Sequence, residues 1–324
     1  MANIFVTGGT GFVGKAVIDR LLDQNHHVYA LVRNPDKCDR KQGDQFTLIQ
    51  GSLDKPFTIP SEVEYIIHIA GVTKANNYDE YFKGNVLTTE NLLTSIRQSK
   101  LTLKRLVGIS SQAVAGPSQT NMPLTEDAPP RPLTWYGETK LIAEQKLLEF
   151  GKEYSTCIIR PPAVYGPRDA DILNVFKFLK YGLNLKIGRK EQYVSVVYVY
   201  NLADGIIRAM THPQAHNQVF YITDEGSYAW SELVDMIATI MNKKYITISL
   251  PYSLAKVVAG IIEYISGFTG KPTILNRQKM IEVNQQYWLC SSEKAKTLLN
   301  FSPTVSTSEA LTETYKWYVS AGWL

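Results

Sequence analysis

Short apolar runs alternate with helical stretches along the first two thirds of the chain, and this alternation limits the possible folds more than any other feature. Each run is rich in β-branched and aromatic residues and is apolar throughout, which is typical of parallel strands covered by helices on both sides. The expected strands are 4–7, 28–32, 46–49, 65–70, 106–110, 157–160, 194–199 and 219–223, and the helices between them include 11–24, 88–99, 136–153 and 202–210. The sequence therefore predicts a doubly wound α/β fold with a parallel sheet.

The pattern of strands and helices changes twice after the first half of the chain. After Gly166 a helix at 172–179 interrupts the strands, and after Asp224 helices dominate to the carboxyl end. We therefore expect residues 1–166 to form the sheet domain, to which the chain returns at about 194–223. The remainder of 167–324 is predicted to form a smaller, mainly helical domain that binds the substrate.

Charge and cysteine usage exclude several function classes. The chain carries 34 Lys and Arg against 30 Asp and Glu without a basic block, so nucleic acid is not an expected partner. Cys38, Cys157 and Cys290 are scattered singly, which argues against a metal site and a disulfide framework. Single thiols fit a reducing compartment, and a strand at 4–7 leaves no room for a targeting peptide, so we expect a cytoplasmic protein.

One apolar stretch near the carboxyl end, 254–268, needs its own interpretation. Lys256 and Glu263 interrupt it, and it is short for a bilayer span, so we expect no transmembrane segment. We interpret the stretch first as a core or lid helix, and second as a helix that lies on a membrane surface.

The glycine-rich segment after the first strand predicts a dinucleotide site. Gly8 permits a tight turn, Gly11 lets the backbone approach a pyrophosphate, and Gly14 lets helix and strand pack closely. The following helix presents free N–H groups and the positive end of its dipole to the phosphates. The residues expected to contact the cofactor here are Thr7, Gly8, Gly11, Phe12, Val13 and Gly14.

The end of the second strand indicates which cofactor is preferred. An acidic side chain there would accept hydrogen bonds from the adenosine ribose and favour NAD. This chain instead has Arg33 after the strand, with Lys37 close behind, and both cations fit a 2′-phosphate. We expect NADP(H) to be preferred over NAD(H), the alternative being that the two cations are solvated loop charges.

A tyrosine and a lysine four residues apart lie at the start of a predicted helix. Tyr136 and Lys140 project from the same helical face, where an ammonium group can stabilise a phenolate and make the tyrosine a general acid or base. Ser111 follows the strand at 106–110, so its hydroxyl can reach a substrate carbonyl at the carboxyl edge of the sheet. These three residues are the candidate catalytic group.

In these segments the chain resembles the extended short-chain dehydrogenase/reductase superfamily, also called the NAD-dependent epimerase/dehydratase family, and the resemblance implies a Rossmann fold. It rests on 7–14, 68–71, 85–86, Ser111, Tyr136 with Lys140, and 160–167, in the family's order and at compatible spacing. The resemblance implies that Tyr136 donates and accepts the proton. It further implies that Lys140 binds the nicotinamide ribose and lowers the tyrosine pKa, and that Ser111 orients the reacting oxygen.

The resemblance also implies further cofactor contacts, and some positions have structural alternatives. Asn85 could instead cap the helix at 86–99. Ser110 could share or replace the role of Ser111, because neighbouring strand residues face opposite ways. We expect His68 to be a packed core residue rather than a catalyst. The implied contacts are Ser52, Leu53, Ala70, Gly71, Asn85, Pro161, Ala163 and Val164, besides Tyr136 and Lys140.

Two positions depart from the family members that act on nucleotide sugars. Ala163 stands where those enzymes often carry Asn, and Val194 stands about where they carry an Arg that holds the diphosphate. Without a charged anchor, diphosphate binding is weakened. The residues at 252–268 are largely apolar or aromatic, which suits an apolar substrate better.

Other segments resemble one branch of the family, the dihydroflavonol reductase and 3β-hydroxysteroid dehydrogenase-like proteins. These segments are Arg33, 201–204 and 317–318, whereas Ala115 and Ser52 replace a tyrosine and an aspartate common in the family. The resemblance implies reduction of a ketone or oxidation of a secondary alcohol. We predict an NADP(H)-dependent oxidoreductase that acts on a fairly apolar small molecule.

Two other functions stay open at this point. A nucleotide-sugar epimerase or dehydratase would hold NAD tightly through its cycle. A binding protein that senses NADP(H) without turnover would have no need for Ser111, Tyr136 and Lys140 together. By analogy with relatives in which helices like 88–99 and 136–150 form a four-helix interface, we expect a homodimer.

Overall fold

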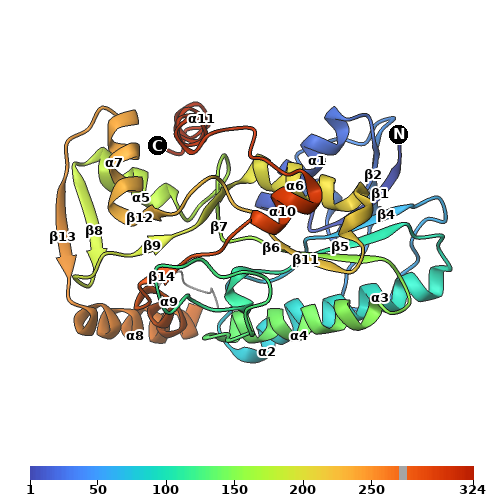
Figure 1. Ribbon diagram of the computed structural model, residues 1–324, viewed down its shortest axis with the longest axis horizontal. Helices are drawn as coiled ribbons and strands as arrows, with labels where there is room; N and C mark the ends of the chain where they lie inside the picture. The colour runs from blue at the N-terminus through green and yellow to red at the C-terminus, as the bar shows by residue number, and fades with distance from the viewer. Residues whose placement is uncertain (270–275) are drawn as a thin grey trace.

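The computed structural model describes residues 1–269 and 276–324, except for the side chains of Lys37 and of 264–269. Its largest element is a seven-stranded parallel sheet with the order β11-β6-β5-β4-β1-β2-β3 (Figure 1). The chain order reverses between β1 and β4, and ligands of such sheets bind outside the carboxyl ends of the strands at the reversal. The strands are β1 (Asn3–Thr7), β2 (His27–Val32), β3 (Phe46–Gln50), β4 (Tyr65–His68), β5 (Arg105–Ile109), β6 (Thr156–Arg160) and β11 (Gln218–Tyr221).

Helices cover both faces of this sheet, as the apolar strands predict. Ile4 and Val6 of β1 belong to the core on the α1 and α6 side, whereas Phe5 belongs to the core beneath α3 and α4. Neighbouring strand residues point to opposite faces, so a strand between two cores must be apolar throughout. The predicted doubly wound α/β fold is confirmed. These helices are α1 (Phe12–Asp23), α3 (Thr88–Ser99), α4 (Trp135–Phe150) and α6 (Val199–Thr211).

Smaller sheets and further helices form the end of the molecule that lies on the left in Figure 1. Its helices are α5 (Leu173–Lys180), α7 (Trp230–Ile240), α8 (Tyr252–Thr269) and α9 (Arg277–Val283). The sequence did not predict the strands here. β8 (Leu183–Ile187) pairs with β13 (Ile246–Leu250), and β9 (Tyr193–Val194) lies between β12 (Tyr228–Ala229) and β14 (Tyr287–Trp288).

The prediction of a single strand at 194–199 is wrong. The segment forms two short strands outside the large sheet, β9 and β10 (Val196–Tyr198), and β10 pairs with β7 (Ala163–Tyr165). Ser195 separates them, because its N–H donates to the Trp288 carbonyl at 2.8 Å and its hydroxyl accepts from the Cys290 N–H at 3.1 Å. These partners lie more than ninety residues away, so the local pattern contains no sign of the break.

The last two helices contact different parts of the molecule. α10 (Glu293–Leu299) packs against β11 of the large sheet, whereas α11 (Thr307–Ser320) packs against α7. The carboxyl-terminal segment therefore touches both the large sheet and the smaller elements.

The apolar stretch at 254–268 lies within α8. Ala255 and Ala259 are buried against Met280 of α9, whereas Leu254 and Val257 are exposed. The side chains from 264 onward lie outside the described residues. The described part of α8 is therefore a surface helix with one buried face, and no helix in the described part of the chain is both long and apolar enough to cross a membrane.

Candidate active site

The glycine loop is shaped by close backbone contacts at the carboxyl end of β1. Gly8 has a φ of +74°, and a Cβ atom there would lie 2.6 Å from the backbone nitrogen of Ala70. A Cβ atom on Gly14 would collide with the Gly8 carbonyl, so both positions require glycine. Gly11 is the exposed N-cap of α1, and the first turn has no acidic residue. Phe12 and Val13, the next two residues, are half-buried.

Thr7 lies behind this loop in a buried hydrogen-bond chain with His68. The imidazole contacts Thr7 Oγ1 through Nδ1 at 2.7 Å and Thr89 Oγ1 through Nε2 at 3.1 Å. Burial lowers the pKa of His68 to about 3, so the ring is neutral. Thr89 donates its own proton to the Asn85 carbonyl at 2.7 Å, which leaves it to accept from Nε2. The prediction of a packed, hydrogen-bonded His68 is confirmed.

The residues expected around the adenosine lie at the ends of β2 and β3. Arg33 follows β2 and is exposed, and β2 neighbours β1 through the pair Thr7 and Leu31. Ser52 donates to Asp54 at 2.5 Å, while Leu53 is buried. The Lys37 side chain lies outside the described residues. Arg33 is thus one strand away from the glycine loop.

Asn85 joins the loop after β4 to α4. It lies in a π-helical turn, Lys83–Leu87, between α2 (Tyr78–Phe82) and α3, so it does not begin a helix. Its side chain accepts from the Val72 N–H at 2.7 Å and donates to Thr139 Oγ1 at 3.1 Å. The helix-cap alternative is therefore wrong. Gly71 lies close to both Asn85 and Lys140. A Cβ atom on Gly71 would lie 3.0 Å from Asn85 Oδ1 and 3.8 Å from Lys140 Nζ.

The carboxyl end of β5 brings Ser111 and Tyr136 together. Ser111 lies just after β5, while Tyr136 lies in the first turn of α4, and the Ser111 side chain is near enough to lower the pKa of Tyr136. The ring of Tyr81 packs against that of Tyr136, with centroids 6.3 Å apart. Ser110 points the other way, into the core, and donates to Glu144 at 2.6 Å. The structure therefore places Ser111, and not Ser110, beside the tyrosine.

Lys140 is buried one turn further along α4. Its ammonium donates to the Ile109 carbonyl at 2.6 Å. Burial lowers the pKa of Lys140 to about 8, although Glu144 opposes this shift. Glu144 is itself held by a buried ion pair with Arg160, which donates from Nε at 3.1 Å. The ammonium is thus fixed between the end of β5 and Gly71.

The pKa of Tyr136 differs from the expectation. Burial raises it to about 12, and the neighbouring Ser111 side chain offsets only part of this rise. Glu282 and Tyr81 add to the rise. The expected lowering by Lys140 is not found: the groups that shift this pKa are Ser111, Glu282 and Tyr81, and the largest cause is burial of the phenol. Tyr136 is therefore a protonated phenol at neutral pH.

Helix α9 covers the first turn of α4. Gln278 accepts from the Trp135 N–H at 2.9 Å, and Glu282 accepts from the Thr134 hydroxyl at 3.4 Å. Thr134 is the N-cap of α4, so these contacts lie one and two residues before Tyr136. Sequence analysis missed Gln278 and Glu282, because they lie more than 140 residues from their partners and belong to no motif.

The remaining expected contacts follow β6. The Pro161 carbonyl accepts from the Gln112 N–H at 2.9 Å, which ties the β6 end to the turn after Ser111. Ala163 is exposed at the start of β7, and Val164 is half-buried. In the part of the chain that the structure describes, no group of three or more His, Cys, Asp or Glu residues could hold a metal ion.

Comparisons with known sequences identify the family. The NAD dependent epimerase/dehydratase family matches residues 4–223. The sterol-4-alpha-carboxylate 3-dehydrogenase (decarboxylating) of Dictyostelium discoideum is 27% identical over 335 residues, covering 97% of this chain and 100% of that protein. The 3 beta-hydroxysteroid dehydrogenase/Delta 5-->4-isomerase of Mycobacterium tuberculosis is 27% identical over 344 residues, covering 99% and 91%.

The fold is shared with solved structures. UDP-glucuronic acid 4-epimerase from Bacillus cereus, in complex with UDP-glucuronic acid and NAD, has a TM-score of 0.79 and 21% identity, covering 98% of this chain and 99% of that chain. At this identity the likeness concerns the fold alone. With the family match over 4–223, we conclude that this chain belongs to the NAD dependent epimerase/dehydratase family and is an NAD(P)-dependent oxidoreductase of the extended short-chain dehydrogenase/reductase type.

Proposed function

We propose that this enzyme interconverts a ketone and a secondary alcohol on a fairly apolar small molecule, with NADP(H) as its cofactor. The observation that carries the proposal is the proximity of the Ser111 and Tyr136 side chains at the carboxyl edge of the sheet. Two hydroxyl groups at one place can both donate to a single substrate oxygen. The sterol names of two full-length relatives support an apolar substrate.

The residues around the glycine loop fit a dinucleotide. Gly11 is an exposed N-cap, and no side chain caps the first turn of α1, which leaves the N–H groups of that turn for phosphates. Exposed Arg33 at the end of the next strand supports a 2′-phosphate. When bound, the nicotinamide of NADPH supplies a hydride to the carbonyl carbon of the substrate.

Residues of this chain bind the substrate oxygen and transfer a proton to it. Ser111 and Tyr136 hold the carbonyl oxygen by hydrogen bonds, and Tyr136 gives its proton to that oxygen as negative charge develops. A pKa near 12 keeps this proton in place until the substrate oxygen becomes basic. Lys140 lies near Gly71, where its ammonium would contact the nicotinamide ribose of the bound cofactor. Alcohol oxidation uses the same groups in reverse.

Replacement of the tyrosine tests the proton transfer. We expect Tyr136→Phe to lower kcat with NADPH and a panel of sterol and aliphatic ketones by about 10²- to 10⁴-fold, because the general acid is lost. The Kd for NADPH should stay unchanged. Tyr81→Phe is the matched control, because its ring packs on Tyr136 and only its hydroxyl is removed. Unchanged turnover in Tyr136→Phe with tight NADPH binding would contradict the assignment.

Titration with both cofactors tests the NADP(H) preference. We expect tighter binding of NADPH than of NADH, and Arg33→Asp should weaken NADPH binding by about tenfold or more, because a charge-assisted contact becomes repulsive. Lys152→Asp, at an exposed lysine away from the expected cofactor contacts, is the control. Tightly copurified NAD, detected by mass spectrometry, with a thermal shift on adding UDP-sugars would favour the nucleotide-sugar epimerase instead.

Three expectations stay predictions. We propose that residues 1–166 with 194–223 form the cofactor domain and that the rest of 167–324 caps it. A homodimer through α3 and α4 is testable by light scattering. The cytoplasmic location is testable by fractionation of cells that produce the protein.

A further inference from the structure

Two segments that are distant in sequence form one cationic end of the molecule. Residues 173–190 contain five Lys or Arg and no acidic residue, and residues 242–262 contain three and no acidic residue. The pairing of β8 with β13 joins them at the left of Figure 1. Because the whole chain has a net charge of only +4, the rest of the molecule is net negative. We call 173–190 and 242–262 the cationic end.

Acidic residues occur only at the borders of the cationic end. Glu191 pairs with Lys186 at 2.7 Å, and Glu263 pairs with Arg277 of α9 at 3.5 Å. Asp235 of α7 accepts from the Tyr245 hydroxyl at 2.6 Å. The exposed cations that remain are Lys177, Lys180, Arg189, Lys190, Lys243, Lys244 and Lys256.

The two-stranded sheet of this end has an apolar face that is only partly covered. The register pairs Leu183 with Ile246 and Leu185 with Ile248, so these four side chains share one face. Ile246 is 66% exposed, and Leu185 and Ile248 are nearly half exposed. Two strands cannot bury this face alone.

Helix α8 adds a second exposed apolar surface at the same end. Its buried face consists of small residues, Ala255 and Ala259. Its outer stripe has the i, i+3, i+4, i+7 spacing of one helical face and is between 36% and 59% exposed. The stripe consists of Leu254, Val257, Val258 and Ile261.

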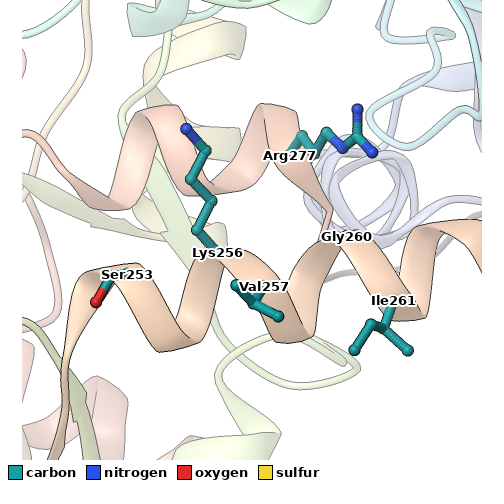
Figure 2. Close-up of a pocket in the computed structure, with 6 residues that line it drawn as sticks. All are labelled: Ser253, Lys256, Val257, Gly260, Ile261 and Arg277. Atoms are coloured by element: carbon teal, nitrogen blue, oxygen red, sulfur yellow. The ribbon is translucent and has the colours of Figure 1, made fainter.

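A hollow of about 590 Å³ lies against α8 and α9. Figure 2 shows Lys256 extending from α8 on the side where α9 lies, whereas Ile261 projects from the opposite side. Both cationic and apolar side chains therefore line this hollow. The lining residues are Ser253, Lys256, Val257, Gly260, Ile261 and Arg277.

We propose that the cationic end docks the protein on the surface of an anionic lipid membrane. The outer stripe of α8 enters the boundary between headgroups and acyl chains, and the surrounding lysines contact the lipid phosphates. A second copy of the chain is disfavoured as the occupant, because two surfaces that each carry this excess of positive charge repel one another. The surface is independent of the proposed reaction, so the two can be tested separately.

Flotation of the full chain with vesicles tests this docking. We expect binding to vesicles of phosphatidylglycerol and phosphatidylcholine in equal amounts, and much weaker binding to phosphatidylcholine alone. High salt should release the protein, because it screens the lipid charge. Absence of binding to the anionic vesicles, or equal binding to both kinds, would overturn the proposal.

Exposed-site variants make the test specific. We expect Lys243→Glu with Lys244→Glu to weaken vesicle binding by about 25-fold or more, since each lysine near the surface contributes about fivefold. Val257→Asp should also weaken binding. Matched controls are Lys55→Glu and Val319→Asp, because Val319 on α11 is 52% exposed against 59% for Val257. A weakening of the same size in the controls would overturn the proposal.

Sedimentation in the absence of lipid tests whether a second copy of the chain covers this surface. Wild-type protein and Val257→Asp should have the same oligomeric state, because the proposed contact is with lipid. A dimer that Val257→Asp converts to a monomer would assign this face to a second copy and overturn the lipid proposal.

Discussion

The large sheet and the cationic end are both built from parallel strands, yet they differ in what happens to their apolar residues. In β1, Ile4 and Phe5 face opposite ways and both are fully buried, because helices cover each side of the sheet. In β8 and β13, Leu185 and Ile246 share an exposed face, and only Ile187 and Leu250 at its end pack in the cluster with Ala255 and Ala259 of α8. The comparison shows that the number of covering layers, and not strand composition, decides whether an apolar strand is core or surface.

Truncation of a leucine in each region should give the largest contrast in stability. Leu92 of α3 is fully buried, so Leu92→Ala should reduce the free energy of unfolding by about 2–5 kcal/mol. Leu254 of α8 is 50% exposed, so Leu254→Ala should change it by no more than about 0.5 kcal/mol. Urea unfolding without lipid measures both. Equal losses would break the comparison and mean that the outer face of α8 has a partner in solution.

Two glycines with nearly the same φ extend the comparison of the large sheet and the cationic end to the backbone. Gly8 in the glycine loop has a φ of +74°, and Gly188 after β8 has a φ of +77°. Both alanine variants have the left-handed strain of about 1 kcal/mol, but only Gly8→Ala also forces a Cβ atom against Ala70. We expect a loss of about 3 kcal/mol for Gly8→Ala and about 1 kcal/mol for Gly188→Ala in thermal unfolding. Similar losses would show that the loop can relax.

The buried Lys140 on α4 should make the stability of the protein depend on pH above neutrality. Its pKa is about 8 in the folded state and 10.5 when unperturbed, so between these values the unfolded chain binds more protons. The wild type should therefore gain on the order of 2 kcal/mol relative to Lys140→Met as the pH rises through this window. Unfolding in urea at several pH values measures the gain. A flat difference between the wild type and Lys140→Met would contradict the burial argument.

Much of the large sheet and its site could be predicted because the signals are local. The apolar strands, the glycine spacing and the four-residue interval between Tyr136 and Lys140 each lie within one short segment. The structure brings Ser111 beside Tyr136 as the strand alternation allows, and sends Ser110 to Glu144. The raised Tyr136 pKa could not be predicted, because it depends on burial beneath residues such as Tyr81 and Glu282.

The smaller elements were predicted less well because their contacts are distant in the chain. β8 pairs with a strand 63 residues away, and Ser195 breaks a predicted strand through Trp288 and Cys290. The charge of the cationic end was also hidden, since neither of its segments is a basic block in the sequence.

The sequence by itself determined the doubly wound sheet, the glycine loop and the candidate catalytic residues, because short-range periodicity and backbone requirements specify them. Only the tertiary structure decided the protonation of Tyr136, the position of α9 over α4, and the joining of two acid-free segments into one surface. The burial of a side chain and the charge around it depend on neighbours that come from all parts of the chain. A short sequence segment does not specify these neighbours, because only folding brings them together.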